Sequence, residues 1–315
     1  MRPEVLVITG PTATGKTRLA VELAKSTGGE VVGADSMQIY RYMDIGTAKP
    51  TPLETGGVPH HMIDVCSPYE DYSVSRYVRE AAAVCDGIIA RGKLPIITGG
   101  TGLYIESLLS GRDFAPKGGG TELREELSRR YDEVGGVEML RRLAEFDPVS
   151  GKKLHFNDKK RIVRAFEVYL STGKTIAEHD EETRKLPPRY TSVTYALNFA
   201  DRQRLYDRID LRVDMMMESG LEREVRGLLD MGLDPKSTAM QAIGYKEIAA
   251  AIRGECTMEE AVEAVKRESR RYAKRQLSWL RRDSSVRWIE LSNAPDIDRA
   301  VREMTADFDG FLDNK

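Results

Sequence analysis

Residues 4–17 read EVLVITGPTATGKT, and this stretch decides the fold. The apolar run at 5–8 is short and rich in β-branched residues, as in a strand buried on both faces of a parallel sheet. From Gly10 to Thr17 the sequence fits G-x-x-x-x-G-K-S/T, a loop whose backbone N–H groups surround phosphate oxygens. A strand before this motif and a helix after it favour a true phosphate site over a chance match. The helix should begin near Lys16, with an apolar stripe at Leu19, Ala20, Leu23 and Ala24.

Each residue type in this motif has a physical role. Glycine lets the backbone fold tightly around an oxyanion, lysine reaches terminal phosphate oxygens, and the last hydroxyl binds Mg²⁺. We therefore predict a di- or triphosphate site that contains Lys16, with Thr17 as a Mg²⁺ ligand. The motif alone leaves open whether ATP or another phosphate ester binds. The predicted phosphate-binding residues are Gly10, Pro11, Thr12, Ala13, Thr14, Gly15, Lys16 and Thr17.

Size and composition indicate a globular core domain with an insertion. The chain has 315 residues, which is long for one domain. No apolar run reaches the length of a membrane span, and the first strand begins too near Met1 to leave room for a signal peptide. The three cysteines form no CxxC pair, so we expect neither zinc nor disulfides. We expect a cytoplasmic protein with no membrane partner, and a monomer by default.

Further strand–turn–helix patterns follow the first one. A second strand at 30–34 ends at Asp35, and a third at 94–98 runs into the glycine-rich turn 99–102. Repeated turns of this kind predict an α/β fold, with a P-loop NTPase-like, doubly wound parallel sheet as its core.

Other segments of the first third are less regular. Residues 77–91 have a helical period that ends at Gly92, a favourable C-cap. Residues 37–50 have no clear period, and we interpret them as a short helix from Met37 and then an ordered loop. The histidine pair at 60–61 has the wrong spacing for one helix face, so we interpret it as structural rather than metal-binding.

The pattern changes in the middle of the chain. Residues 116–120 form a glycine-rich linker, and residues 121–185 are charged and helical with no convincing strand. We therefore predict a helical insertion domain at 116–189, within a core domain formed by 1–115 and 190–315.

The second part of the core domain has elements of its own. A strand is expected at 192–198 and a last short strand at 286–289. The methionines at 215–217 are more typical of core filling than of a special site. A long helix between the strands is marked by Leu205, Ile209, Val213 and Met216.

Asp35 and Thr101, with Lys16, are the candidate catalytic residues. Ligands of open α/β sheets bind at the carboxyl ends of the strands, so Asp35 should lie at the same edge as the phosphate loop. There it is a candidate base beside the phosphates. The alternative is that Asp35 or Ser36 caps the following helix. Thr101 also has two interpretations, as a hydroxyl that faces the same space or as another N-cap.

Positive charge late in the chain is a second signal. Residues 266–282 contain eight cationic residues and one acidic residue, and on a helix the cations occupy about half of the surface. A solvated helix face normally mixes signs, so this pattern favours a polyanionic partner. A smaller cluster at 159–161, with Arg164, lies in the insertion. The two clusters are candidates for the two sides of one groove.

Several longer motifs resemble one family. They are DSMQIY at 35–40, MDIGTAKP at 43–50, PHH at 59–61, GGTGLY at 99–104, NDKKR at 157–161, MQAIGYKE at 240–247 and KRQLSWLR at 274–281. With the phosphate loop, they are similar to the bacterial tRNA dimethylallyltransferases, also called tRNA isopentenyltransferases, over essentially the whole chain. The chain departs from the family at Phe156, where proline is expected, at Phe166, where leucine is commoner, and in the run Gly118–Gly120.

The resemblance implies an activity and its substrates. The family transfers the dimethylallyl group of dimethylallyl diphosphate, with Mg²⁺ present, to N6 of the adenosine at tRNA position 37, beside the anticodon. The phosphate loop would then hold the diphosphate, the anticodon stem-loop of tRNA would be the partner, and Asp35 would accept the proton of the adenine amine. The residues assigned to tRNA by the motifs and the basic clusters are Asp35, Ser36, Met37, Gln38, Thr101, Lys160, Arg161, Arg164, Gln241, Tyr245, Arg270, Arg271, Lys274 and Arg275.

Other functions stay open at this point. A P-loop kinase that uses ATP would explain the phosphate loop and Asp35, but it would leave the cations at 266–282 without a role. Prenyl transfer to a free adenine nucleotide is a second alternative. A non-catalytic RNA-binding or nucleotide-switch protein is a third, and it would bind tRNA without forming a product.

Overall fold

The computed structural model describes residues 4–111, 120–291 and 297–312. Its contacts divide the chain into two compact units. The first unit comprises Met1–Leu109 and Arg189–Lys315, and the second comprises Ser110–Pro188.

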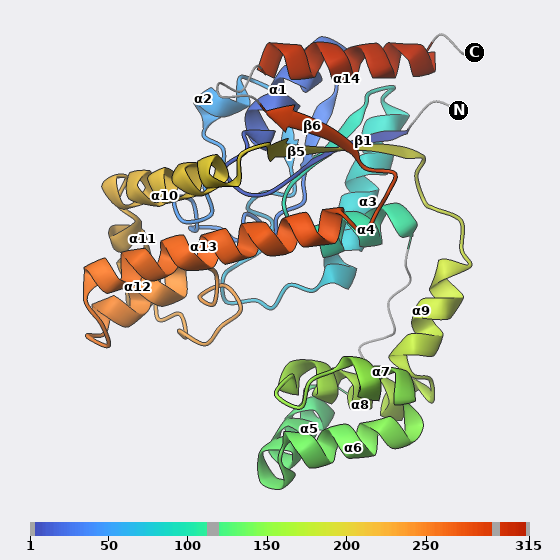
Figure 1. Cartoon of the computed structure of the whole chain (residues 1–315), viewed down its shortest axis with the longest axis vertical. Helices are drawn as coiled ribbons and strands as arrows, with labels where there is room; N and C mark the ends of the chain where they lie inside the picture. Colours follow the sequence, from blue (N-terminus) through green and yellow to red (C-terminus); the bar gives the residue numbers. More distant parts are fainter. Residues whose placement is uncertain (1–3, 112–119, 292–296, 313–315) are drawn as a thin grey trace. The chain divides into compact units, whose positions relative to one another are not determined.

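The first unit is built on one sheet of six strands, all parallel (Figure 1). Their order across the sheet is β3-β2-β4-β1-β5-β6, so β1 lies between β4 and β5. The parallel α/β core predicted from the sequence is confirmed. The strands are β1 Val5–Thr9, β2 Glu30–Gly33, β3 His60–His61, β4 Pro95–Thr98, β5 Ser192–Phe199 and β6 Arg287–Leu291.

Helices cover both faces of this sheet. Successive side chains of β1 point to opposite faces, so Val5 and Val7 join a core cluster with α3, whereas Leu6 and Ile8 join another with α1 and α14. This is the doubly wound arrangement. The helices are α1 Lys16–Thr27, α2 Pro52–Thr55, α3 Val74–Ala90, α4 Gly102–Ser110, α10 Arg202–Glu218, α11 Leu221–Asp230, α12 Tyr245–Ile252, α13 Met258–Leu280 and α14 Ile297–Leu312.

The strand order determines where a ligand can bind. From β1 the chain crosses to β2 on the β4 side of the sheet, whereas β5 and β6 lie on the other side of β1. Ligands of such sheets bind outside the carboxyl ends of the strands at the point where the order reverses. The turns that follow β1, β2 and β4 all lie at that edge.

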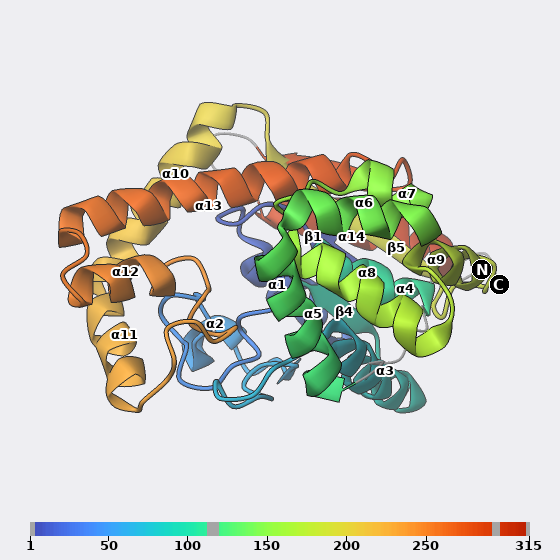
Figure 2. The same ribbon diagram turned by 90° about the horizontal axis from the view of Figure 1, so that it is seen from below.

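In the second unit the described residues form helices and the connections between them, with no strand (Figure 2). Its core contains Met139, Leu143, Ile162 and Ala165. The predicted linker at 116–120 and the glycine run within it lie outside the described residues, except that Gly120 begins the first helix. The helices are α5 Gly120–Val134, α6 Gly136–Phe146, α7 Pro148–Lys153, α8 Lys159–Thr172 and α9 Ile176–Arg184.

One prediction about local structure is wrong, and a second holds for two of its three residues. The segment from Met37 is a turn and not a helix, because Tyr40 leaves it to form a parallel bridge with Cys66. Met37 packs partly against the core. Met215 does not fill the core, since 56% of its surface is exposed, although its two neighbours do pack there.

Strand β3 and the helices α2, α11, α12 and α14 were not predicted from the sequence. Strand β3 has only two residues, too few for a period to be read. Helix α14 packs on α1. Among the described residues, no helix is both long and apolar enough to cross a bilayer.

Candidate active site

The phosphate loop adopts backbone conformations that few residues tolerate. Gly10 has a φ of +137°, and a Cβ there would lie 2.5 Å from the carbonyl oxygen of Leu197. Ala13 and Gly15 have φ values of +66° and +84°, in the left-handed region. Gly15 is the N-cap of α1 and has no side chain to cap it, so the first N–H groups of the helix are available to an anion.

The ammonium group of Lys16 lies in this loop. Its Nζ donates a hydrogen bond to the carbonyl oxygen of Pro11 at 2.8 Å. Burial, and then the positive charge of Arg212, lower the pKa of Lys16 to about 7, while the carboxylate of Asp35 opposes the shift. A bound anion would supply the missing countercharge.

Two arginines of α10 complete this positive charge, and neither was predicted as a site residue from the sequence. Arg208 donates from Nε to the carbonyl oxygen of Ala13 at 3.0 Å. Arg212, one turn later, interacts electrostatically with Lys16 and with Asp35. Burial lowers the pKa of Arg212, and the negative charge of Asp35 opposes that shift. The spacing of four residues puts both arginines on one helix face, which is the sequence signal that could have found them.

The turn after β2 brings Asp35 next to Thr101. Oδ1 of Asp35 accepts hydrogen bonds from the backbone N–H groups of Met37, at 2.9 Å, and Gln38, at 3.4 Å. No described residue donates to Oδ2, so one carboxylate oxygen caps the turn and the other remains for a ligand. Thr101 accepts from the N–H of Ser36 at 3.0 Å, and its hydroxyl lies 3.3 Å from that of Ser36. The hydroxyl of Thr101 therefore holds the Asp35 turn instead of capping α4.

Two side chains of α13 join the glycine-rich turns. Gln276 accepts a hydrogen bond from the N–H of Thr12 at 3.0 Å and donates one to the carbonyl oxygen of Gly100 at 2.9 Å. Tyr272 donates to the same carbonyl at 3.3 Å. Burial, and then the charge of Asp35, raise the pKa of Tyr272 to about 12, so its hydroxyl stays protonated at neutral pH. The phosphate loop, the Asp35 turn and α13 thus form one cluster.

The carboxylate of Glu224, on α11, holds the loop that contains the MDIGTAKP motif. Its oxygens accept from the backbone N–H groups of Asp44, Ile45 and Gly46 at 2.8 to 3.0 Å. The hydroxyl of Tyr245 donates to the same carboxylate at 2.5 Å. Burial and the charge of Glu224 raise the pKa of Tyr245. The prediction that Tyr245 contacts tRNA is wrong, because its side chain is fully buried.

The side chains of two glutamines predicted to contact tRNA already donate hydrogen bonds to the backbone of nearby loops. Nε2 of Gln38 donates to the carbonyl oxygens of Thr47 and Ala48 at 3.0 and 3.1 Å. Nε2 of Gln241 donates to the carbonyl oxygen of Pro235 at 2.9 Å, although the residue is exposed. The amide oxygen of Gln38, and the amide oxygen and one N–H of Gln241, are left to meet a nucleotide.

The predicted metal ligand, Thr17, lies in the first turn of α1. It is half-buried, and its hydroxyl is hydrogen-bonded to no described residue. The described parts of the chain contain no group of three or more His, Cys, Asp and Glu side chains that could hold a metal. A Mg²⁺ ion at Thr17 would therefore need ligands from the bound substrate, which is how Mg²⁺ commonly binds beside phosphates.

Comparison with known proteins identifies the family. The IPP transferase model matches residues 38–283, and the isopentenyl transferase model matches residues 3–64. The chain belongs to the IPP transferase family.

Individual IPP transferases match this chain over nearly its whole length. The tRNA dimethylallyltransferases of Acetivibrio thermocellus and Desulforudis audaxviator are 47% and 46% identical, over 95% and 96% of this chain and 96% of each relative. The crystal structure of the tRNA isopentenylpyrophosphate transferase of Bacillus halodurans has a TM-score of 0.74 and 38% identity, over 98% of this chain and 96% of its own. A eukaryotic dimethylallyltransferase, crystallised as it acts on tRNA, has a TM-score of 0.82 and 28% identity, over 96% of this chain and 79% of its own.

In this IPP transferase the cations of α13 are not all free. Arg270 pairs with Asp210 of α10 at 2.5 Å, and Lys266 pairs with Asp214 of the same helix at 2.7 Å. These two pairs fasten α13 to α10. The guanidinium of Arg270 therefore already has a carboxylate partner, and its contact with tRNA stays a prediction.

The other cations of α13 are more accessible. Lys274 and Arg275 are exposed, and no described carboxylate pairs with either. The guanidinium of Arg275 lies 5.5 Å from the ring centre of Tyr272. Arg271 is also exposed, although it pairs with Glu268 at 2.6 Å. The free positive charge of this helix is thus next to the side chains that join the glycine-rich turns.

In the second unit the predicted cations also differ in whether a carboxylate pairs with them. Lys160 is exposed without a described partner, and Arg161 is exposed with Asp158 at 3.8 Å. Arg164 lies 3.0 Å from Glu167, a carboxylate with only 2% of its surface exposed. Arg164 therefore serves first as the countercharge of a buried acid.

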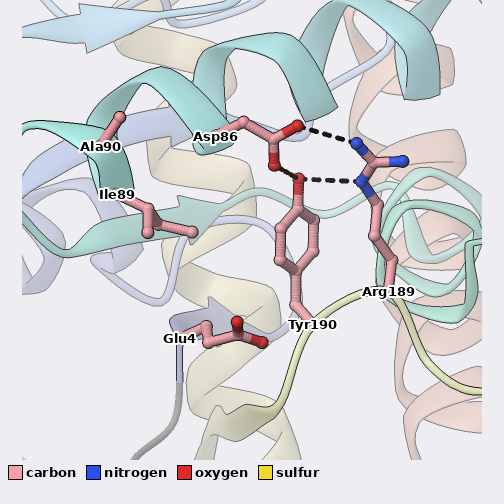
Figure 3. Close-up of a pocket in the computed structure, with 6 residues that line it drawn as sticks. All are labelled: Glu4, Asp86, Ile89, Ala90, Arg189 and Tyr190. Atoms are coloured by element: carbon pink, nitrogen blue, oxygen red, sulfur yellow. Dashed lines mark hydrogen bonds and ion pairs between the residues drawn. The ribbon is translucent and has the colours of Figure 1, made fainter.

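A cavity of about 420 Å³ lies at the opposite edge of the sheet, where β1 and β5 begin. Its polar groups are already paired, because Tyr190 donates to Asp86 at 2.6 Å and Arg189 pairs with Asp86 at 2.8 Å (Figure 3). The N–H of Arg189 also donates to the carbonyl oxygen of Leu109 at 2.9 Å. We interpret this cluster as structural. The cavity is lined by Glu4, Asp86, Ile89, Ala90, Arg189 and Tyr190.

Proposed function

We propose that this IPP transferase moves the dimethylallyl group of dimethylallyl diphosphate to N6 of the adenosine at tRNA position 37, and releases diphosphate. The observation that carries the proposal is a carboxylate beside two cations: the charge of Asp35 acts on both Lys16 and Arg212 at the rim of the phosphate loop. A base for the amine and a site for the leaving group are therefore adjacent. The relatives named tRNA dimethylallyltransferase support the choice of substrates.

The leaving group is the diphosphate, and the loop at 10–17 would bind it. Lys16 and Arg212 would pair with its oxygens, and the N–H groups at the start of α1 would donate to them. Thr17 would hold a Mg²⁺ ion through its hydroxyl, together with the diphosphate. When bound, such an ion stabilises the negative charge that develops as the carbon–oxygen bond breaks.

The nucleophile is the exocyclic amine of adenine, which is weak because its lone pair is delocalised into the ring. Oδ2 of Asp35 would accept the proton of this amine as N6 attacks the allylic carbon. The new N6–carbon bond forms while the carbon–oxygen bond breaks. The electron pair of the carbon–oxygen bond leaves with the diphosphate. Oδ1 stays on the backbone of the turn, and Thr101 fixes that turn through Ser36.

The acceptor base must leave its stack to reach this site. A nucleotide in an anticodon loop is unpaired and therefore costs little to extrude. The exposed cations at Lys274 and Arg275, and at Lys160 and Arg161, would contact the RNA backbone. We also propose that the protein acts as a monomer in the cytoplasm, where its free cysteines would stay reduced.

The test is a transfer reaction with labelled dimethylallyl diphosphate, Mg²⁺ and an unmodified tRNA that carries adenosine at position 37. Nucleoside analysis should recover the label in N6-dimethylallyladenosine. A tRNA with guanosine at that position is the control and should stay unlabelled. Absence of transfer, with turnover of ATP on a small metabolite instead, would overturn the proposal in favour of a kinase.

A further inference from the structure

An aromatic pair is exposed where α7 connects to α8 in the second unit. The rings of His155 and Phe156 lie close together and tilted, with centroids 4.1 Å apart and planes 32° apart. Phe156 leaves 40% of its surface exposed, and His155 is exposed as well. Phe156 is also one of the positions at which the chain departs from the sequence expected of the family.

The backbone under this pair is held firmly. The hydroxyl of Tyr131 donates to the carbonyl oxygen of Phe156. The N–H of Asp158 donates to the carbonyl oxygen of His155 at 2.8 Å, and the N–H of Asn157 donates to its Nδ1 at 3.2 Å. The pair is therefore presented to solvent in one orientation, so a flat ligand would lose little entropy in ordering it.

Cations flank the pair on both sides. Lys152 and Lys153 end α7, and Lys160 and Arg161 belong to the first turn of α8. All four are exposed, and three of them have no carboxylate partner among the described residues. The carboxylate of Asp158, 3.8 Å from Arg161, is the negative charge in this segment. Positive charge around an exposed ring matches a ligand with phosphates and flat bases.

We propose that His155 and Phe156 form a stacking platform for an unpaired base of the RNA substrate. The inference rests on the proposed function, because it takes tRNA as the partner. The base would stack on the outer face of the Phe156 ring, while the flanking cations pair with the phosphates on either side of it. An acidic protein segment would use the cations but has no general need of the ring, so the exposed aromatic pair favours RNA.

The test compares three substitutions of Phe156 by titrating unmodified tRNA at fixed salt. Phe156→Ala and Phe156→Leu should each raise the Kd by about tenfold, because both remove the ring. Phe156→Tyr should bind within about twofold of the original protein, since it keeps the ring. Leu170→Ala is the matched control: Leu170 is an exposed apolar residue of the same unit, with 58% of its surface exposed. It should leave the Kd unchanged.

A second readout separates stacking from general packing. A tRNA with 2-aminopurine at one unpaired position of the anticodon loop should lose fluorescence on binding if that base stacks on the platform, and a set of such tRNAs covers each position in turn. Quenching at one position that disappears in Phe156→Leu supports the platform. Equal Kd values for Phe156→Ala, Phe156→Leu and the original protein, or quenching that survives both substitutions at every position, would overturn it.

The outcome is separable from that of the proposed function. If the original protein transfers the dimethylallyl group and the ring substitutions change neither Kd nor quenching, the platform is wrong and the reaction stands. If the original protein binds tRNA through Phe156 but transfers nothing, the platform stands and the reaction is wrong. The kcat at saturating tRNA should be the same for all four variants, since none of these side chains lies among the reacting groups.

Discussion

The side chain of Gln276 accepts a hydrogen bond from the backbone N–H of Thr12, at 3.0 Å. It also donates to Gly100, so one amide on α13 joins the phosphate loop to the second glycine-rich turn. The amide is nearly inaccessible, with 7% of the residue exposed. The helix that carries the free cations is therefore bonded directly to the loop proposed to hold the diphosphate.

Replacing Gln276 should loosen both turns. Gln276→Leu leaves the N–H of Thr12 unpaired and leaves the carbonyl of Gly100 with the longer hydrogen bond from Tyr272, at 3.3 Å. It should lower the free energy of unfolding by about 1–3 kcal/mol. The KM for dimethylallyl diphosphate should rise as well. Ser278→Ala, on the exposed side of α13, is the control and should change neither. Chemical denaturation and steady-state kinetics measure the two effects, and unchanged values for Gln276→Leu would contradict the link.

Asp35 should be required for turnover and dispensable for RNA affinity. Asp35→Asn keeps an oxygen that can cap the turn but removes the base, so kcat should fall by about 10²–10⁴-fold while the Kd for tRNA stays the same. Asp35→Ala removes the cap too and should also lower stability. Near-native turnover by Asp35→Asn at neutral pH would show that Asp35 is not the base.

Lys16 should take up a proton when the diphosphate binds. Its pKa is about 7 in the free protein, and an anion raises it, so between those two values binding is coupled to protonation. Near pH 8 the uptake should approach about one proton per site, and it should fade below about pH 6, where Lys16 is already charged. Calorimetry in buffers with different ionisation enthalpies measures it.

Two variants check this assignment. Lys16→Arg keeps a charge that does not titrate, so the proton uptake should disappear. Arg212→Gln removes a positive charge that lowers the pKa of Lys16, so the onset of uptake should move to higher pH. Uptake that persists in Lys16→Arg would assign the proton to another group.

Glu30 should make the protein sensitive to acid. Burial opposes its ionisation, but hydrogen bonds from Lys93, His61 and Arg91 outweigh burial and lower the pKa of Glu30 to about 2 from 4.5. The folded-state pKa is depressed, so the stabilisation is present above about pH 4.5 and is lost as the pH falls towards 2. Its size is on the order of 3 kcal/mol. Unfolding of Glu30→Gln should differ from the original at pH 6 and converge with it in acid, and a constant difference would refute the assignment.

The free cations of α13 should contribute to the salt dependence of RNA binding. Neutralising Lys274 and Arg275 together to glutamine should weaken tRNA binding at low salt and reduce the slope of log K against log salt by roughly 1.4. Arg267→Gln serves as the control, because that arginine lies on the same helix 3.8 Å from Glu268. Filter binding across a salt series measures the slopes, and equal slopes would remove α13 from the RNA interface.

The parts of the site that the sequence predicts are those with a local pattern. The strand at 5–9, the glycine-rich loop and Asp35 follow one another along the chain, so spacing identifies them. Gln276 bonds to Thr12, 264 residues away, and Arg212 acts on Lys16, early in the chain. No pattern in the sequence around either residue indicates these partners.

Motifs and charge runs assigned some residues to tRNA whose side chains have partners within the protein. Tyr245 belongs to a motif assigned to tRNA, yet its ring fills the core and its hydroxyl serves Glu224. A cation run likewise does not say which of its members are already neutralised: Arg270 pairs with Asp210 on another helix, and only the fold brings the two together. In both cases the side chain's partner came from tertiary packing, which overrides a linear pattern.

The hydrogen bond between Arg189 and Leu109 brings together the two points at which the helical unit is inserted into the sheet domain. The chain leaves the sheet domain and returns to it at neighbouring points, so the 79 residues between these points are an insertion. A turn of a few residues could bridge that gap with the sheet order intact. The helical unit can therefore be lengthened, shortened or replaced in the sequence without a change in the strand order of the sheet domain or in its phosphate loop.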